Sequence, residues 1–152
     1  MALLNYIKVL AIMLSIGQCN DTEALLQGRE VRFNETFMIS AGEDVTVVGE
    51  GETLTLRLEE VVDSRCPTDV TCVWAGNAIT NFIVGNAGEQ NVGLQFCILD
   101  CRTGPIRSTH VQKQTIGGHV YEFTLLDVLP YPTTSNHDRT KEAKLIIKPE
   151  NK

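Results

Sequence analysis

After residue 28, hydrophobic and polar residues alternate over most of the chain. The alternation is clearest in the runs 31–33, 37–39, 45–47, 54–58, 78–84, 92–98, 121–125 and 145–147. A period of two is typical of strands that bury one face, and no window of about twelve residues shows a capped helical period. The pattern predicts about eight short strands in an all-β domain over 29–149. We expect an antiparallel two-sheet β-sandwich, immunoglobulin-like or jelly-roll-like, with a closed barrel as the alternative.

One hairpin can be placed in register from its turn. Gly117 and Gly118 form a two-residue turn signal between two alternating runs. Pairing outward from this turn sets Lys113 opposite Glu122, and opposite charges favour this register over a slip of one residue. The polar segment 133–142 is expected to be an exposed loop before the last strand.

The first 18 residues differ from the rest of the chain. They carry one charged side chain, Lys8, followed by an apolar run at 9–14 and a small-residue end, so 1–18 is predicted to be a secretory signal peptide. The run is too short for the roughly 20 apolar residues of a spanning helix. Cys19 follows directly, and this segment resembles the bacterial lipoprotein signal, although Gln18 replaces the usual small residue. The resemblance implies that Cys19 carries lipid and that 19–28 tethers the domain to a bilayer, with cleavage nearby and an unmodified thiol as the alternative.

The remaining cysteines form an even set. The chain has five, and assigning Cys19 to lipid leaves four that can pair in three ways. We favour Cys66 with Cys72 and Cys97 with Cys101, because short loops close at low entropic cost. The second pair needs a turn, since an extended chain would separate those two residues by about 13 Å. A zinc site is disfavoured by the spacing and by export.

The composition and the motifs of the chain argue against several classes of function. Thirteen Lys and Arg against 19 Asp and Glu give a net charge of −6, which argues against a nucleic-acid partner. No phosphate-binding loop or nucleophile elbow occurs. His110 and His119 are too far apart along their strands to share a metal. The sequence therefore predicts no catalytic residue, metal or cofactor, and it favours a protein that is not an enzyme.

One segment carries a family resemblance. It reads Asp63-Ser64-Arg65-Cys66-Pro67, then Cys72, then Trp74-Ala75-Gly76, with 54–61 before it and 121–132 after it. The whole resembles an uncharacterised family of exported bacterial proteins, many of which look like lipoproteins. The resemblance covers most of 45–148 and implies export, but it implies no activity. The pair Cys97 and Cys101 lies outside the family's pattern.

The same segment is the candidate recognition loop. A turn closed by Cys66 and Cys72 would be rigid, and rigid loops lose little entropy on binding. The candidate residues are Asp63, Arg65, Pro67, Asp69 and Trp74. We expect Arg65 to lie outside the closed turn and the Trp74 indole to pack on the disulfide and the core. An Arg65 buried in an ion pair would instead make the segment a scaffold, and the disulfide could simply stabilise the fold by about 2–3 kcal/mol.

These observations predict an exported, envelope-tethered, non-catalytic binding or structural module of the bacterial periplasm or cell surface. Its expected partners are a lipid bilayer, through acylated Cys19, and an envelope protein. One alternative is an enzyme inhibitor or ligand-binding protein that uses the loop from Arg65 to Trp74. Another is a small hydrolase whose site, with Ser64 as its nucleophile, assembles only in three dimensions.

Overall fold

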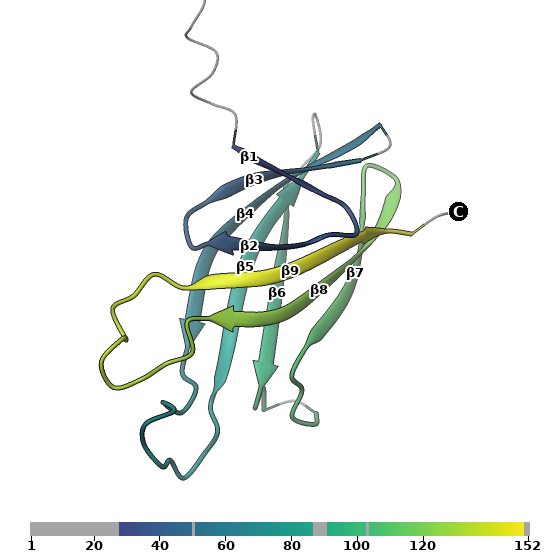
Figure 1. The fold of residues 1–152 in the computed structure, drawn as a ribbon. Helices are drawn as coiled ribbons and strands as arrows, with labels where there is room; N and C mark the ends of the chain where they lie inside the picture. Colours follow the sequence, from purple (N-terminus) through teal and green to yellow (C-terminus); the bar gives the residue numbers. More distant parts are fainter. Residues whose placement is uncertain (1–27, 50, 87–90, 103, 151–152) are drawn as a thin grey trace, which may run out of the picture.

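The computed structural model describes residues 28–49, 51–86, 91–102 and 104–150, and forms a two-layered β-sandwich. The expected signal peptide, Cys19 and all of the tether except Gly28 lie outside the described residues. The strands are β1 (Arg29–Arg32), β2 (Thr36–Ser40), β3 (Asp44–Gly49), β4 (Glu52–Asp63), β5 (Asn77–Gly85), β6 (Val92–Leu99), β7 (His110–Ile116), β8 (His119–Leu129) and β9 (Glu142–Pro149). One sheet has the order β1-β3-β4-β5-β6 and the other β2-β9-β8-β7 (Figure 1). The sandwich prediction is confirmed, and the described strands form no closed barrel.

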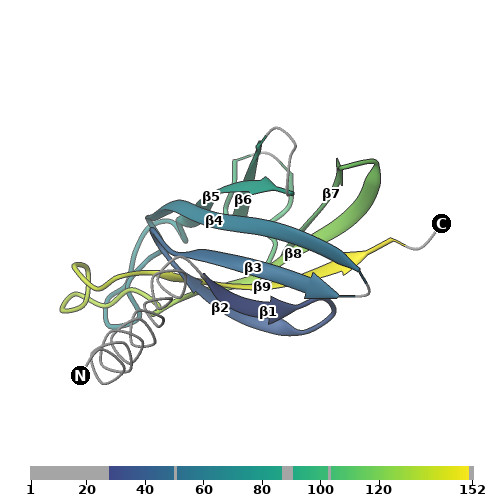
Figure 2. The same cartoon turned by 90° about the horizontal axis from the view of Figure 1, so that it is seen from above.

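The alternating residues form the core between the two sheets. Seen from above, β5 and β6 lie on the opposite side of the molecule from β1 and β2 (Figure 2). Each strand turns one set of alternate side chains inward, because successive side chains point to opposite faces. Fully buried members from the two sheets include Leu54, Leu56, Leu58, Phe82, Phe96, Phe123, Leu125, Leu145 and Ile147. The hydrophobic pattern thus positions both sheets before any loop contact is considered.

One strand pair departs from the antiparallel expectation. β1 pairs with β3 in parallel, with Arg29 beside Val45, whereas every other described strand pair is antiparallel. The chain passes from the first sheet into β2 of the second sheet and then returns, so β1 and β3 run in the same direction. The pairing of β1 with β3 depends on residues far apart in the chain, so the local alternation of hydrophobic residues does not predict it.

The hairpin register is confirmed. β7 pairs with β8 so that Lys113 lies opposite Glu122. Gly117 and Gly118 both have positive φ, at 60° and 78°, as the tight turn requires. The Lys113 ammonium, however, forms its ion pair with Glu150, at 2.6 Å. The turn therefore fixes the register. The Glu122 charge still helps to raise the pKa of Lys113, after the larger effect of Glu150.

Three connections gather at one end of the sandwich, which we call the loop end: residues 64–76, 100–102 with 104–109, and 130–141. The start of β1 and the end of β9 lie toward the other end (Figure 1). The segment expected to be an exposed loop, 133–142, falls almost wholly in the third connection. No helix in the described ranges is long and apolar enough to cross a membrane.

Candidate binding surface at the loop end

Both predicted disulfides are present, and both lie at the loop end. Cys66 bonds Cys72 and Cys97 bonds Cys101, each with a Cα–Cα separation of 5.9 Å. Leu99, with φ of 69°, provides the turn that the second pair needs. Two short-range disulfides indicate an oxidising, extracytoplasmic environment.

Arg65 lies outside the closed turn and is buried in an ion pair with Asp63, which is the alternative that makes this part of the segment a scaffold. Its residue exposure is 3%. The guanidinium donates to both carboxylate oxygens of Asp63, at 2.7 and 2.8 Å, and to the carbonyl of Val128 at 2.7 Å. It also lies 4.1 Å from the ring centroid of Tyr131 and 3.4 Å from Asp127. Because its donors are satisfied inside the protein, Arg65 is a scaffold residue and offers no charge to a partner.

Lys141 completes this buried charge group. Its ammonium donates to Asp63 at 2.9 Å and to the carbonyl of Pro130 at 2.8 Å. Burial alone would raise the pKa of Asp63, but the hydrogen bonds from Arg65 and Lys141 and the Arg65 charge outweigh it and hold that pKa below its usual range. We call Asp63, Arg65, Tyr131 and Lys141 the Arg65 cluster. It ties the end of β4 to the connection between β8 and β9.

Hydrogen bonds fasten the base and the first part of the loop 64–76. The Cys66 N–H donates to the Ala75 carbonyl at 2.9 Å, across the base of the loop. Pro67 begins a turn closed by a hydrogen bond from the Val70 N–H, at 3.3 Å. The Asp69 carboxylate accepts from the N–H and hydroxyl of Thr134, at 3.0 and 2.5 Å, and these bonds lower its pKa. Asp69 is therefore engaged within the protein, like Asp63 and Arg65.

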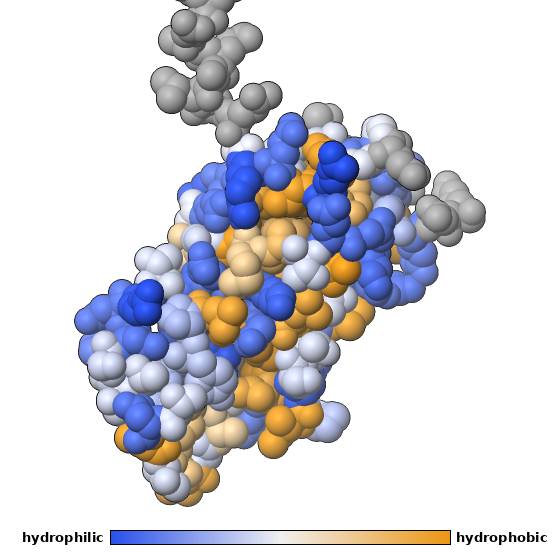
Figure 3. Space-filling view, viewed as in Figure 1, coloured by the Kyte–Doolittle hydropathy of each residue, from blue (hydrophilic) through white to orange (hydrophobic). Residues whose placement is uncertain are grey.

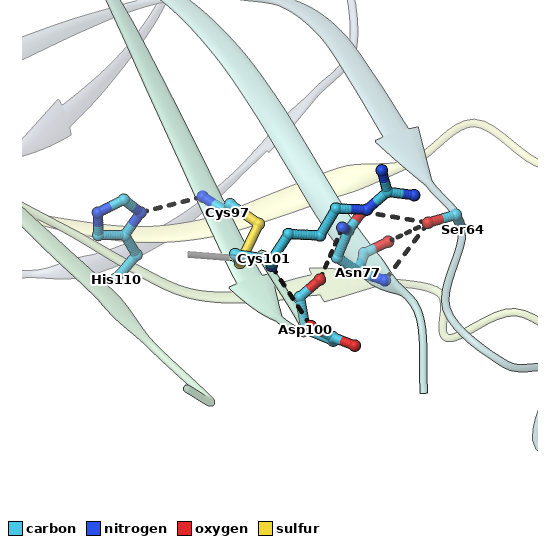
Figure 4. The surroundings of a disulfide bond; sticks show 7 residues. Ser64, Asn77, Cys97, Asp100, Cys101 and His110 are labelled. Atoms are coloured by element: carbon cyan, nitrogen blue, oxygen red, sulfur yellow. Dashed lines mark hydrogen bonds between the residues drawn. A yellow bond between two sulfur atoms is a disulfide. The ribbon is translucent and has the colours of Figure 1, made fainter. Parts of the chain in front are cut away.

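Gly76 allows the two sides of the loop base to approach closely. Its φ is +70°, and a Cβ there would lie 2.0 Å from the Ser64 carbonyl oxygen. The Gly76 carbonyl accepts from the Asp100 N–H at 3.1 Å, and the Asn77 side chain donates to the Asp100 carbonyl at 2.8 Å. These contacts fix the connection that carries the Cys97–Cys101 disulfide against the first loop (Figure 4).

Ser64 has no base beside it in the described part of the chain. Its hydroxyl lies 3.1 Å from both the backbone and side-chain oxygens of Asn77. His110 lies on the other side of the Cys97–Cys101 disulfide, where its Nδ1 accepts from the Cys97 N–H at 3.0 Å (Figure 4). The structure thus does not assemble the nucleophile and base that hydrolysis at Ser64 would need.

The tip of the first loop exposes hydrophobic side chains. Trp74 is 70% exposed and Val73 is fully exposed, at 107%. The expectation that the Trp74 indole packs on the disulfide and core is wrong. Val70, Val73 and Trp74 do not follow a period of two, and this break was the sequence signal that they leave the strand pattern.

Exposed hydrophobic residues concentrate at this end of the molecule. The large hydrophobic side chains that are exposed in the described ranges are Val62, Val70, Val73, Trp74, Ile106, Val111 and Tyr131. Five are in the loop-end connections, and Val62 and Val111 stand within two residues of one. Hydrophobic atoms reach the surface at the lower tip in Figure 3, where the loop 64–76 lies. Exposed hydrophobic side chains that gather at one end of a molecule make that end a candidate interaction site.

The end of the sandwich opposite the loop end has a hollow and a hydrogen-bonded group of polar side chains. A shallow hollow of about 370 Å³ is lined there by Arg32, Phe33, Glu52 and their neighbours. The Tyr121 hydroxyl donates to Glu52 at 2.9 Å, and His119 lies 2.8 Å from the same carboxylate. Burial, and then the Glu52 hydrogen bond and charge, raise the pKa of Tyr121 to about 12. Tyr121 is therefore a neutral hydrogen-bond donor at ordinary pH.

A scan against protein-family models, a search of curated proteins and a search of solved structures each find no match for this chain. The loop end is thus interpreted from its own geometry. It combines a hydrogen-bonded base, two disulfides and exposed apolar side chains.

Proposed function

We propose that this protein is an extracytoplasmic, non-catalytic binding module that docks on another protein through its loop end. Val73 and Trp74 enter an apolar depression of the partner. The observation that carries the proposal is the 70% exposure of Trp74, which lies two residues beyond the turn closed by the Cys66–Cys72 disulfide. Tryptophan is enriched among the residues that dominate binding energy at protein interfaces.

The exposed indole provides enough surface to matter. An aromatic side chain buries roughly 150–250 Å², and 70% of that range is about 105–175 Å². At about 25 cal/mol per Å², removing this area from water contributes about 3–4 kcal/mol. The base is already ordered by its disulfide and hydrogen bonds, so little of this is offset by loop ordering.

The chain enters the domain part-way along the first sheet. Arg29 lies beside Val45, which pairs with Leu56, seven residues before Asp63 at the loop end of β4. At about 3.3 Å per residue the chain enters the domain about 23 Å from that end. Export through 1–18, lipid on Cys19 and membership of the exported bacterial family complete the proposal.

A second candidate function is inhibition of an enzyme. The eight consecutive exposed residues 68–75, which begin inside the turn closed by Cys66 and Cys72 and continue past it, form a segment that could enter a cleft. Inhibition and docking use the same residues. They differ in the consequence for the partner, which loses activity only if the loop occupies its active site.

Site-specific photocrosslinking tests the proposal. A photoreactive amino acid at Val73 should give one discrete protein adduct in the cells that make the protein, and Trp74→Ala should remove that adduct. The same probe at Thr115, which is exposed on β7 outside the loop end, should give none. An adduct with lipid alone, an equal adduct from both positions, or no adduct contradicts docking through the loop end. Assaying the captured protein with and without the domain separates inhibition from docking.

The anchor needs its own experiment. Labelled palmitate should be incorporated into the protein, and Cys19→Ser should abolish the incorporation while both disulfides persist. Protein that incorporates no palmitate, because Cys19 is a free thiol or is removed with the leader, would contradict the lipid anchor. Docking through the loop end would then still be decided by the crosslinking experiment.

A further inference from the structure

One sheet edge lacks the features that usually prevent strands from pairing with other molecules. Of the four edge strands, β1 carries charges at three of its four positions, and β7 contains Lys113. β2 is short, and the carbonyl of Met38 within it accepts a hydrogen bond from Arg29. β6, by contrast, has eight residues and no charge or proline. A long, uncharged edge strand presents an unprotected row of backbone donors and acceptors.

The hydrogen bonds of β6 show which of its backbone groups face outward. The Cys97 N–H points away from β5, because it donates to His110. Leu99 likewise exchanges both of its backbone bonds with Arg107, at 2.7 and 3.4 Å. In an antiparallel pair the outward-facing residues alternate, so odd-numbered positions of β6 face the free edge.

By the same alternation, the backbone N–H and carbonyl groups of Gly93 and Gln95 point away from β5, and both residues are exposed. The two capped positions, Cys97 and Leu99, close the lower half of the edge. No other described residue forms a backbone hydrogen bond with Gly93 or Gln95 at the free edge. The upper half of β6 therefore offers two N–H groups and two carbonyls, two residues apart.

We propose that this edge pairs antiparallel with β6 of a second copy of the chain. A two-fold axis at Leu94 sets Gly93 of one copy opposite Gln95 of the other, and the reverse. Each pair then exchanges two hydrogen bonds, and all four open groups of each copy are satisfied. The position where a Gly93 Cβ would stand has no atom within 4 Å, so the opposing Gln95 side chain has room.

The pairing joins two five-stranded sheets into one continuous sheet across the dimer. The contact is small beside the roughly 1,200–2,000 Å² of a stable interface, so the dimer is expected to be weak. Each chain carries a net charge of −6, and the repulsion between copies is screened by salt. Association should therefore strengthen as ionic strength rises. This inference is independent of the proposed docking through the loop end.

Sedimentation velocity over a range of protein concentrations, combined with amide hydrogen exchange, tests the pairing. The purified protein with its disulfides intact should self-associate, and the amides of Gly93 and Gln95 should gain protection as concentration rises. Gly93→Lys, which places a charge on each side of the axis, should raise the dissociation constant at least tenfold. Thr115→Lys adds the same charge to exposed β7 and should leave it unchanged. Both variants should keep the wild-type melting temperature.

Three results would overturn the proposal. The first is a monomer at millimolar concentration and high salt. The second is a dimer in which the two β6 amides gain no protection, which places the contact elsewhere. The third is protection that appears only when a different protein is added, which makes β6 a docking edge for a strand of that protein rather than for a second copy.

Discussion

Replacing Arg65 tests whether the buried charge cluster holds the loop end together. Arg65→Ala removes two hydrogen bonds to Asp63, one to Asp127 and one to the Val128 carbonyl. Among the described residues, Lys141 is then the cation that remains paired with the Asp63 carboxylate. Breaking a buried ion pair by removing one partner costs about 3–5 kcal/mol. We expect a loss of that size in the free energy of unfolding, measured with urea at pH 7 with disulfides intact.

Arg57→Ala is the matched control. Arg57 also forms an ion pair, at 2.6 Å with Asp44, but both side chains are about half exposed, at 48% and 61%. Exposed pairs contribute about 0–1 kcal/mol, so this variant should lose no more than that. The difference between the losses in free energy of unfolding of the two variants measures the effect of burial, because both variants remove an ion pair.

The pH dependence adds a second requirement. The lowered pKa of Asp63 means that its ion pair stabilises the wild type above about pH 4 and that this stabilisation is lost as the pH falls through the lowered value. In Arg65→Ala, protonation of Asp63 relieves the poorly compensated buried charge. The cost of the substitution should therefore be largest at pH 7 and smaller at pH 3. A cost below 1 kcal/mol, or one that does not change between these pH values, would refute the account of the cluster.

Three further outcomes follow from single contacts. Gly76→Ala should lower the melting temperature far more than Gly42→Ala, because both have positive φ but only Gly76 would place a Cβ against backbone; equal losses would contradict this. Trp74, the single tryptophan, should emit like free tryptophan and be quenched by acrylamide, whereas blue-shifted, shielded emission would place it in the core. Tyr121 should ionise only near pH 12, and stability should fall as the pH rises from about 10 through that value. Glu52→Gln should lower the Tyr121 pKa, as followed by ultraviolet titration, and an unchanged midpoint would exclude Glu52 as a cause.

The sheets could be predicted from the sequence because their signals are local. Alternation in segments such as 54–58 states which side chains point inward, whatever the strand later pairs with. The glycine pair at 117–118 similarly fixes a register from turn chemistry alone. The parallel pairing of β1 with β3 could not be predicted, because it depends on which sheet β2 joins.

The loop end was predicted only in part, since its contacts span long stretches of chain. The two disulfides follow from the low cost of closing short loops. The burial of Arg65 depends on the Val128 carbonyl, 63 residues away, and on the Tyr131 ring. Neither partner can be chosen from sequence spacing. A tryptophan beside a cysteine usually packs inward, but Trp74 lies where the strand alternation is broken and its side chain stays exposed.

The division of labour within the loop has an evolutionary consequence. The base is held by Cys66, Gly76 and the Arg65 cluster, whereas the side chains of Val73 and Trp74 stand outside the core. Substitutions at the tip therefore leave the folding of the sandwich almost untouched. Such a scaffold can acquire new specificities by drift at a few projecting positions, and it could be diversified in the laboratory at those positions as a display framework.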